Sequence, residues 1–525
     1  ERTLGVALRF RFITLMVFLA TVTCTVILYV IIPKGFFPAQ DTGLMIGVTQ
    51  AGQDVSFQKM MQLQVQAMAI IGKDPDVASY NGVIGSGLGA QTGNNGKVFI
   101  SLKPWSQRKS SVQQVIARLR PKLATIKGLN VFLQAAQDLN VGARFAAAQY
   151  QYTLQDASLS QLYAWAPRME AKLKTLPMLR DVATDLQMAG TTATLTINRD
   201  AASRLGVSLQ QIDDTLYDAF GQRQVTQFFT QVNTYHVVLE VLPSQVGKLS
   251  TIDKLYVTSS SGATVPLSSL MTTSTLPVAP LSINHQSQFP AVTLSFNLAQ
   301  GASLGAAVVA IQQAAAQIGA PATLTGSFQG TAQAFQSSLA TEPYLIAAAL
   351  IAVYIILGIL YESYILPLTI LSTLPAAGLG ALLMLMLTGQ SLTVIALIGI
   401  ILLIGIVKKN GIMLVDFAIT AERQDGQAPV DAIRQACLLR FRPILMTTMA
   451  ALLSGLPLML MGGAGAELRR PLGAAMVGGL LVSQVLTLYT TPVVYLYLDR
   501  LQHWLVPKRR SSMPKLAEKL GATAD

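Results

Sequence analysis

The stretch SYILPLTILSTLPAAGLGALLMLMLTGQSLTVIALIGIILLIGIV, residues 363–407, contains no charged side chain. A helix needs about 20 apolar residues to cross a bilayer core of roughly 30 Å, so this stretch is too long for one span. The polar turn TGQS at residues 388–391 divides it into two parts. We therefore predict two consecutive membrane spans, the second of which runs from about Leu392 to Phe417.

Four further apolar runs meet the same criterion, at residues 12–32, 343–361, 443–461 and 471–498. Six spans place both ends of the chain on one side of the membrane. Basic side chains gather in residues 1–11, in a predicted amphipathic loop at 418–442 and in the tail at 499–525, so the positive-inside rule makes that side the cytoplasm. The chain begins at Glu1 without a signal peptide, and we expect it to be the later part of a longer protein.

Only 12% of the 525 residues are charged and 51% are hydrophobic, whereas soluble domains carry about 25% charged residues. The net charge of +12 comes partly from the basic tail. Such a tail contacts phosphates in a nucleic-acid-binding protein, but beside a span it is typical of a cytoplasmic anchor. Cys24, Cys437 and three histidines provide neither a disulfide framework nor a soft metal site. We expect no nucleic-acid partner and no metal site.

The segment between the first two spans, residues 33–340, alternates strand and helix patterns. Strands are expected at 44–49, 77–83, 98–102 and 131–134, with helices at 55–71 and 112–126, which is the βαββαβ order. A related pattern begins at residue 150, is interrupted by a Thr-, Val- and Ser-rich insertion at about 221–285, and resumes at residue 291. Two related modules are predicted, although any α+β domain alternates in this way. The predicted fold is an α-helical membrane bundle of six spans with α+β subdomains.

Ionisable side chains interrupt the fourth and fifth spans. Lys408 and Lys409 lie within the fourth, and Arg440 begins the fifth, with Thr447 on the same helix face two turns later. Lys408 is interpreted as reaching the membrane surface with its long side chain. Lys409 lies deeper and requires a carboxylate partner, yet the other five predicted spans contain no Asp or Glu. The sequence therefore predicts an acidic partner outside this chain.

Several motifs resemble those of resistance-nodulation-division (RND) multidrug efflux pumps. GIVKKNGIMLVDF at 405–417 resembles their tenth span, and LRFRPILMTT at 439–448 the start of their eleventh. LGILYES at 357–363 resembles the end of the eighth span, and PKGFFP at 33–38 the entry into the porter domain. The resemblance covers essentially the whole chain as the C-terminal half of such a pump, and it is greatest to the MdtB/MdtC branch, whose members can assemble together.

This resemblance implies an inner-membrane trimer, homomeric or formed with a related RND subunit, that works with a periplasmic adaptor protein and an outer-membrane channel. Residues 33–340 would be periplasmic and both termini cytoplasmic. Residues 33–140 would form one porter subdomain, 141–220 with 286–330 the next, and 221–285 a docking subdomain. Proton influx, without a cofactor, would drive the export of drugs or other amphiphilic small molecules.

The resemblance also implies roles for individual residues. By motif match, Lys409, Asn410, Arg440 and Thr447 occupy the positions of the family's proton relay. Their carboxylate partners would lie in the fourth span of the missing N-terminal half, which agrees with the acidic partner that Lys409 requires.

A candidate substrate pocket follows from the same comparison. Phe99 and Phe132 match pocket phenylalanines of AcrB-type pumps, while Gln134 stands where another phenylalanine is common. Ala136 lies beside them, and Ser86 and Leu88 belong to a glycine-rich loop at 85–96 that has no aromatic residue. Because aromatic faces give broad binding, this pocket is expected to be narrower or more polar. The alternative is that both phenylalanines are core residues of strands.

Three other functions fit the sequence less well than drug export. A metal-exporting RND pump would gather methionines, but Met60, Met61 and Met68 share one predicted helix, which is more typical of core packing. A proton-driven accessory subunit of protein export fits the motifs poorly. The sequence contains no P-loop, nucleophile elbow or HExxH motif, so a transporter is predicted and not an enzyme.

Overall fold

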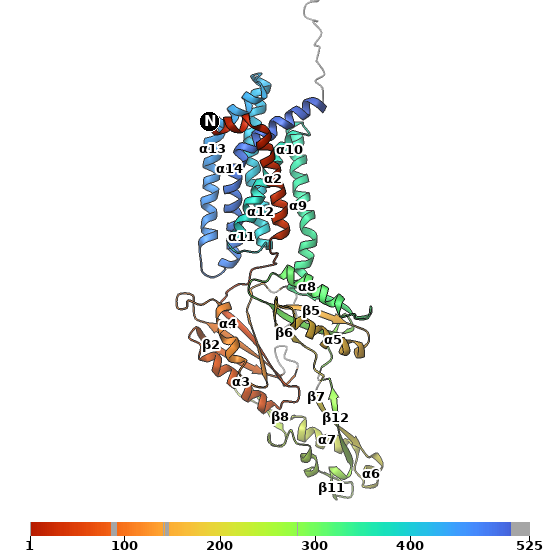
Figure 1. Ribbon diagram of the computed structural model, residues 1–525. Helices are drawn as coiled ribbons and strands as arrows, with labels where there is room; N and C mark the ends of the chain where they lie inside the picture. The colour runs from red at the N-terminus through yellow and green to blue at the C-terminus, as the bar shows by residue number, and fades with distance from the viewer. Residues whose placement is uncertain are drawn as a thin grey trace, which may run out of the picture.

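The computed structural model describes residues 2–85, 92–139, 141, 146–188, 190–280 and 282–505. Within them, six helical segments are long and apolar enough to cross a membrane, as the apolar runs predict. They form a bundle at one end of the molecule, and the α+β part extends from the other end (Figure 1). The spanning helices are α2 (Arg11–Ile31), α9 (Thr331–Tyr361), α10 with α11 (Leu366–Leu371 and Leu374–Leu387), α12 (Val394–Gln424), α13 (Pro429–Leu460) and α14 (Ala466–Leu505).

Helix α14 lies at the centre of the bundle because glycines allow close approach. A Cβ atom on Gly478 would lie 2.4 Å from the carbonyl oxygen of Gly380 on α11. A Cβ on Gly479 would lie 2.3 Å from a methyl carbon of Leu403 on α12. Small residues at these crossings let helix backbones pack closely in a membrane, where the hydrophobic effect does not drive helices together.

Two helices extend beyond the bounds expected from hydropathy. The predicted loop at 418–442 is mostly helical, since α12 continues to Gln424 and α13 begins at Pro429. The buried residues Ala418 and Ile419 of α12 pack with Ile433 and Ala436 of α13 in one apolar cluster. The amphipathic pattern of this segment therefore marks two helix ends that pack together, with the polar residues on their outer sides.

The first α+β subdomain contains β1 (Leu44–Ala51), α3 (Phe57–Gly72), β2 (Val77–Ile84), β3 (Asn95–Leu102), α4 (Val112–Leu123) and β4 (Leu129–Ala135). Its antiparallel sheet has the order β2-β3-β1-β4. Residues such as Met45, Val98 and Leu133 face α3 and α4 and form the core. Helix α4 begins with a capping box, in which Ser111 and Gln114 satisfy each other's free N–H groups.

The second α+β subdomain repeats this arrangement with β5 (Tyr150–Gln155), α5 (Leu159–Lys174), β6 (Leu179–Thr184), β14 (Phe289–Leu298), α8 (Leu304–Gln317) and β15 (Thr325–Gln329). Strand β14 pairs with β5 and β6, and β15 pairs with β5. The order β6-β14-β5-β15 is that of the first sheet, as the predicted repeat requires. The short strand β13 (His285–Gln286) forms a hairpin with β14.

The inserted subdomain begins earlier than the sequence indicated. Strand β7 (Gly190–Ile197) pairs with β12 (Met271–Ala279) and, among the described residues, with no strand of the second sheet. Helices α6 (Arg199–Arg204) and α7 (Leu209–Phe220) share a separate core with residues 252–271. Residues 190–220, which we assigned to the second porter subdomain, thus belong with the insertion. The sequence pattern marks a strand but not its partner, which explains the difference.

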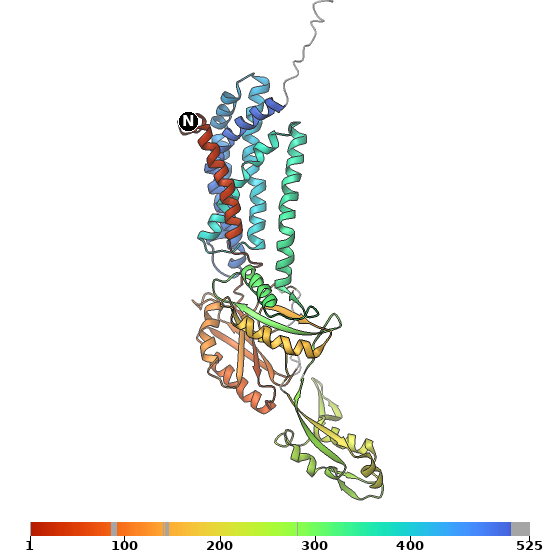
Figure 2. The same ribbon diagram turned by 45° about the vertical axis from the view of Figure 1, so that its right-hand side comes forward.

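The remaining strands of the insertion are β8 (Arg223–Phe229) with β9 (Thr234–Leu239) and β10 (Tyr256–Thr258) with β11 (Thr264–Pro266). The β7–β12 ribbon carries this subdomain away from the two sheets, at the end of the molecule farthest from the membrane helices (Figures 1 and 2).

Candidate functional site

A polar contact joins α12 and α13 inside the bundle. The side-chain amide of Asn410 donates a hydrogen bond of 3.1 Å to the Thr448 hydroxyl, and both residues are buried. These two helices are antiparallel neighbours. About two turns farther along each helix, Arg440 lies over the ring of Phe417, with 5.2 Å between the guanidinium carbon and the ring centroid.

The four predicted relay residues lie on this pair of helices but do not all face the same way. Asn410 is buried between α12 and α13, whereas Lys409 and Thr447 are exposed on the bundle surface. One residue corresponds to about 100° around a helix, so Lys409 lies around the side of α12 from Asn410. Thr447 donates to the carbonyl oxygen of Ile444 at 3.2 Å. Arg440 is half-buried, and its Nε has no hydrogen-bond partner among the described residues.

A buried carboxylate lies directly before the residue at which hydropathy predicts the second span to begin. Helix α9 begins at Thr331 and not at residue 343, and it contains Glu342, whose residue surface is 5% exposed. Tyr29 of α2 donates to its Oε1 at 3.0 Å, and the ammonium of Lys34 lies 4.9 Å from the Tyr29 ring centroid. The predicted span at 343–361 thus contains no acidic residue, whereas the whole of α9 contains Glu342. The hydrogen bond from Tyr29 offsets part of the cost of burying this carboxylate.

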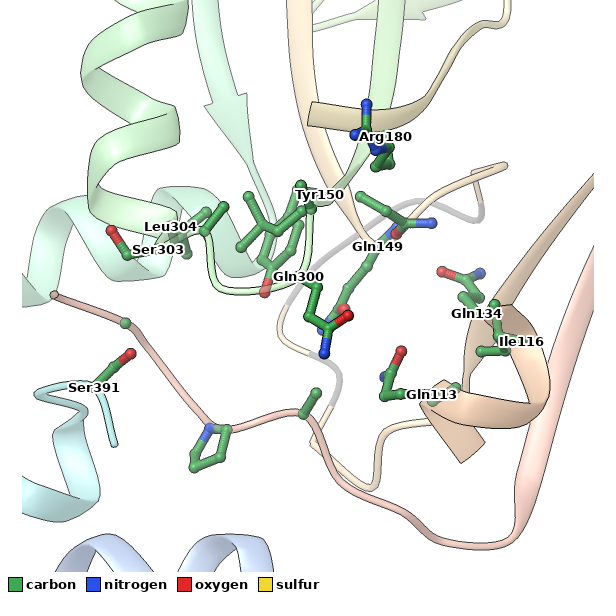
Figure 3. Close-up of a pocket in the computed structure, with 18 of the residues that line it drawn as sticks. Gln113, Ile116, Gln134, Gln149, Tyr150, Arg180, Gln300, Ser303, Leu304 and Ser391 are labelled. Carbon is green, nitrogen blue, oxygen red and sulfur yellow. The ribbon is translucent and has the colours of Figure 1, made fainter. Parts of the chain in front are cut away.

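A cavity of about 910 Å³ lies where the two α+β subdomains meet the membrane helices. Gln113, Ile116 and Gln134 of the first subdomain line it on one side, and Gln149, Tyr150 and Arg180 of the second line another (Figure 3). Residues 35–39 and the turn at 389–393, between α11 and α12, complete the lining. The labelled side chains are mostly amides and hydroxyls, so the cavity suits uncharged polar or amphiphilic molecules.

An ion pair links the two subdomains beside this cavity. Arg120 of α4 contacts Asp181 of β6 at 2.6 Å, and the Asn297 amide donates to the same carboxylate oxygen at 3.0 Å. Arg120, Asn297 and Arg180 also line the cavity. Asp181 adopts a φ of 52°, an uncommon conformation that aspartate tolerates better than most residues. A second link is formed by the Thr92 hydroxyl and Gln187 at 3.4 Å.

The candidate substrate residues share the open face of the first sheet. Phe99 of β3 pairs with Ile46 of β1, and Ile46 pairs with Gln134 of β4. Paired residues lie on one face, which Phe132 shares because it is two residues from Gln134. Phe99 is 36% exposed, and neither phenylalanine belongs to the core beneath α3 and α4. The alternative of two core residues is therefore not supported.

Only some of these residues line a cavity. Gln134 and Ala136 border a second space of about 140 Å³ together with Ile46, whereas Phe99 and Phe132 line neither this space nor the larger cavity. Lys97, two residues before Phe99, is buried, and this burial lowers the pKa of its ammonium group. Ser86 and Leu88 lie outside the described residues.

Known proteins share this architecture. A crystal structure described as that of a heavy metal efflux pump matches with a TM-score of 0.83 and 23% sequence identity. The match covers 95% of this chain and 52% of that chain, so this chain spans about half the length of that pump. At this identity the match shows the fold. Residues 1–499 match the sequence model of the AcrB/AcrD/AcrF family, and the chain therefore belongs to this family of RND inner-membrane transporters.

Proposed function

We propose that this chain is the C-terminal half of a proton-driven exporter of drugs or other amphiphilic small molecules. The observation that carries the proposal is the exposure of Lys409 on a membrane-spanning helix, beside the buried Asn410–Thr448 contact. A lysine that faces lipid at this depth is costly, and such residues normally face a protein partner with a carboxylate. The exposed face of α12 and α13 is thus the surface where an acidic partner half would bind.

A carboxylate close to Lys409 would have a pKa that depends on that ammonium group. Proton uptake would then neutralise the carboxylate, release the lysine from its partner and change the packing across this face. Thr447 and Arg440 lie on α13, beside α12. They would form hydrogen bonds with the partner carboxylate or with Lys409 as the proton moves. The orientation with both termini in the cytoplasm and residues 33–340 in the periplasm follows from the distribution of basic residues.

The cargo would bind in the α+β part. The large cavity between the two subdomains and the open sheet face with Phe99 and Phe132 provide amide, hydroxyl and aromatic surfaces for an amphiphilic molecule. The Arg120–Asp181 pair spans the two subdomains and would break when they separate. We propose a trimer of identical or related subunits, as in the MdtB/MdtC branch, together with an adaptor protein and an outer-membrane channel.

The test is drug susceptibility of cells that express the complete pump with Lys409→Ala, with pump abundance measured by immunoblot. Lys408→Ala is the matched control, because this neighbouring lysine is half-buried on a different side of α12. We expect Lys409→Ala to abolish resistance at normal abundance and Lys408→Ala to retain most of it. Unchanged resistance in Lys409→Ala cells would contradict the proposed role.

The same assay separates drug export from metal export. Cells with the intact pump should tolerate more of an amphiphilic drug and no more of zinc, copper or silver salts. Tolerance that rises only for a metal salt would assign the pump to metal efflux. Replacing Phe99 and Phe132 together by alanine should change which drugs are tolerated, since the open sheet face would lose its aromatic surface.

A further inference from the structure

Helix α14 carries a row of uncharged polar residues deep in the bundle. Ser483, Gln484, Thr487, Thr490 and Thr491 are all buried, with exposed fractions between 0% and 8%. At about 100° per residue, they occupy an arc of roughly 120° on one side of the helix. The other residues of α14 at this depth are apolar except Tyr489, whose hydroxyl donates to Thr3 on a different side of the helix.

Glycine contacts show which neighbours this polar row faces. Gly473 lies on the same side of α14 as Gln484 and Thr491, and a Cβ there would be 2.5 Å from the Met459 nitrogen of α13. Gly479 lies on the side of Ser483 and Thr490 and meets Leu403 of α12. The row is therefore directed toward the groove between α12 and α13, which is where Asn410 and Thr448 meet.

Two contacts between α12 and α14 show at which level of the bundle the polar row lies. Gly399 of α12 lies against Ala475 of α14, and Glu422 accepts a 2.8 Å hydrogen bond from Tyr495. Because α12 and α14 run in the same direction, Asn410 lies at the level of Gln484.

Helix α13 runs the opposite way. Gly455 lies against Val477 of α14, which places Thr448 at the level of Gln484 and Arg440 at the level of Thr491. The row thus extends from the Asn410–Thr448 contact to Arg440.

Hydrogen bonding divides the row into two groups. The hydroxyls of Ser483 and Thr490 donate to the carbonyl oxygens of Leu480 and Leu486, at 3.2 and 2.9 Å. Both amide atoms of Gln484 and the hydroxyls of Thr487 and Thr491 have no partner among the described residues. Arg440 Nε and the Thr369 hydroxyl of α10 likewise have no hydrogen-bond partner among the described residues. Each such group costs several kcal/mol at this depth in a membrane unless it is hydrogen-bonded.

We propose that Gln484, Thr487 and Thr491 bind a row of water molecules that conducts protons between the Asn410–Thr448 contact and Arg440. Water is the ligand that matches the chemistry, because hydroxyl and amide groups both donate and accept and buried water usually forms about three hydrogen bonds to such groups. The inference rests on the proposed proton-driven function and adds the residues that carry the proton along α14.

Proton movement along the row of water molecules leaves the protein chemically unchanged. Each water accepts a proton from one neighbour and gives another to the next, so one proton leaves the far end for each that enters. The hydroxyls of Thr487 and Thr491 and the amide of Gln484 hold the waters in line and remain neutral. In the proposed orientation, Arg440 lies at the cytoplasmic end of the row.

The test uses the complete pump in proteoliposomes with a pH-sensitive dye inside. The test variant combines Gln484→Leu, Thr487→Val and Thr491→Val. The matched control combines Ser483→Ala and Thr490→Val, which remove hydroxyls that already bond to the helix backbone. A third variant, Lys409→Ala, reports on the proposed function itself. Proton flux, thermal unfolding and hydroxyl-radical labelling of the peptide around residues 483–491, which detects bound water, are measured for each.

We expect the test variant to conduct protons roughly tenfold or more slowly, to show less labelling and to unfold at the same or a higher temperature. Replacing buried groups that bond only to water by apolar groups of similar shape does not destabilise a bundle. Loss of a purely structural role would instead lower the unfolding temperature and leave the labelling unchanged. The control should keep its flux. If Lys409→Ala stops the flux and the test variant does not, the water row is contradicted. If Lys409→Ala conducts normally, the proposed function itself fails.

Discussion

Asp41 and Arg108 form a buried ion pair that fixes the start of the first α+β subdomain. The guanidinium donates two hydrogen bonds to the carboxylate, and the backbone N–H of Val112 donates a third at 2.8 Å. The two side chains are 7% and 1% exposed. Removing one partner leaves the other charge buried and unpaired, which typically costs about 3–5 kcal/mol.

Asp41→Ala should therefore lower the stability of the first subdomain by roughly that amount, measured as the denaturant midpoint of the purified pump by tryptophan fluorescence. Glu170→Ala is the control, because the Glu170–Lys174 pair lies on a helix surface with the lysine 57% exposed. Such a pair contributes about 0–1 kcal/mol. Equal shifts in the two variants would contradict this account.

The sequence revealed some of the functional candidate residues and not others, and the difference has a physical reason. Lys409 and Arg440 stand out in the sequence because a charge in an apolar run is rare. Gln484, Thr487 and Thr491 do not, since uncharged polar residues barely interrupt an apolar run and only the bundle shows that they are buried. Glu342 was missed because hydropathy marks where apolar residues begin and not where the helix begins.

Among the elements, the β8–β9 hairpin of the inserted subdomain exposes large apolar side chains. Phe229 and Val232 are 72% and 96% exposed, and Phe228 stacks on Tyr235 with ring centroids 5.4 Å apart. An isolated two-stranded hairpin is marginally stable in water, and exposed apolar patches mark interaction sites. We therefore expect this hairpin to pack against a neighbouring subunit.

The expected result is that Phe229→Asp with Val232→Asp weakens subunit association, by roughly tenfold for each 1.4 kcal/mol lost. Native mass spectrometry of the detergent-solubilised pump would show smaller assemblies at a given concentration. Val246→Asp, a change at an exposed residue outside the hairpin, should leave assembly intact. An unchanged distribution in the double variant would show that the hairpin is not an interface.

Helices and strands were easier to predict from the sequence than the pairing between strands. The six spans follow from length and hydropathy, and the four strands of the first sheet follow from alternating apolar residues. Strand β15 of the second sheet was not predicted. Strand β7 has the same local pattern as the strands around it, yet it pairs with β12 at a long distance in sequence. Pairing at long range depends on the folded chain, so the insertion boundary could not be found from residues 190–220 alone.

In the molecule as a whole, α12 connects the polar helix pair in the membrane with the large cavity, because Thr393 at its start lines the cavity and Asn410 lies farther along the same helix. The link runs through the segment at residues 33–36, whose backbone bonds both to Leu392 at the start of α12 and to Gly305 of α8. A change in packing of α12 would thus reach the cavity lining, which includes both Gly35 and Leu304. This continuity is why proton movement and cargo movement are expected to be coupled.

The most direct measurement is drug transport by the complete pump in proteoliposomes with an imposed proton gradient. Accumulation of a fluorescent amphiphilic drug is followed before and after an uncoupler collapses the gradient, without nucleotide. The account predicts that transport occurs only while the gradient is present and that Lys409→Ala abolishes it. Transport that continues without a proton gradient, or that requires ATP, would contradict the claim that this chain is half of a proton-driven exporter.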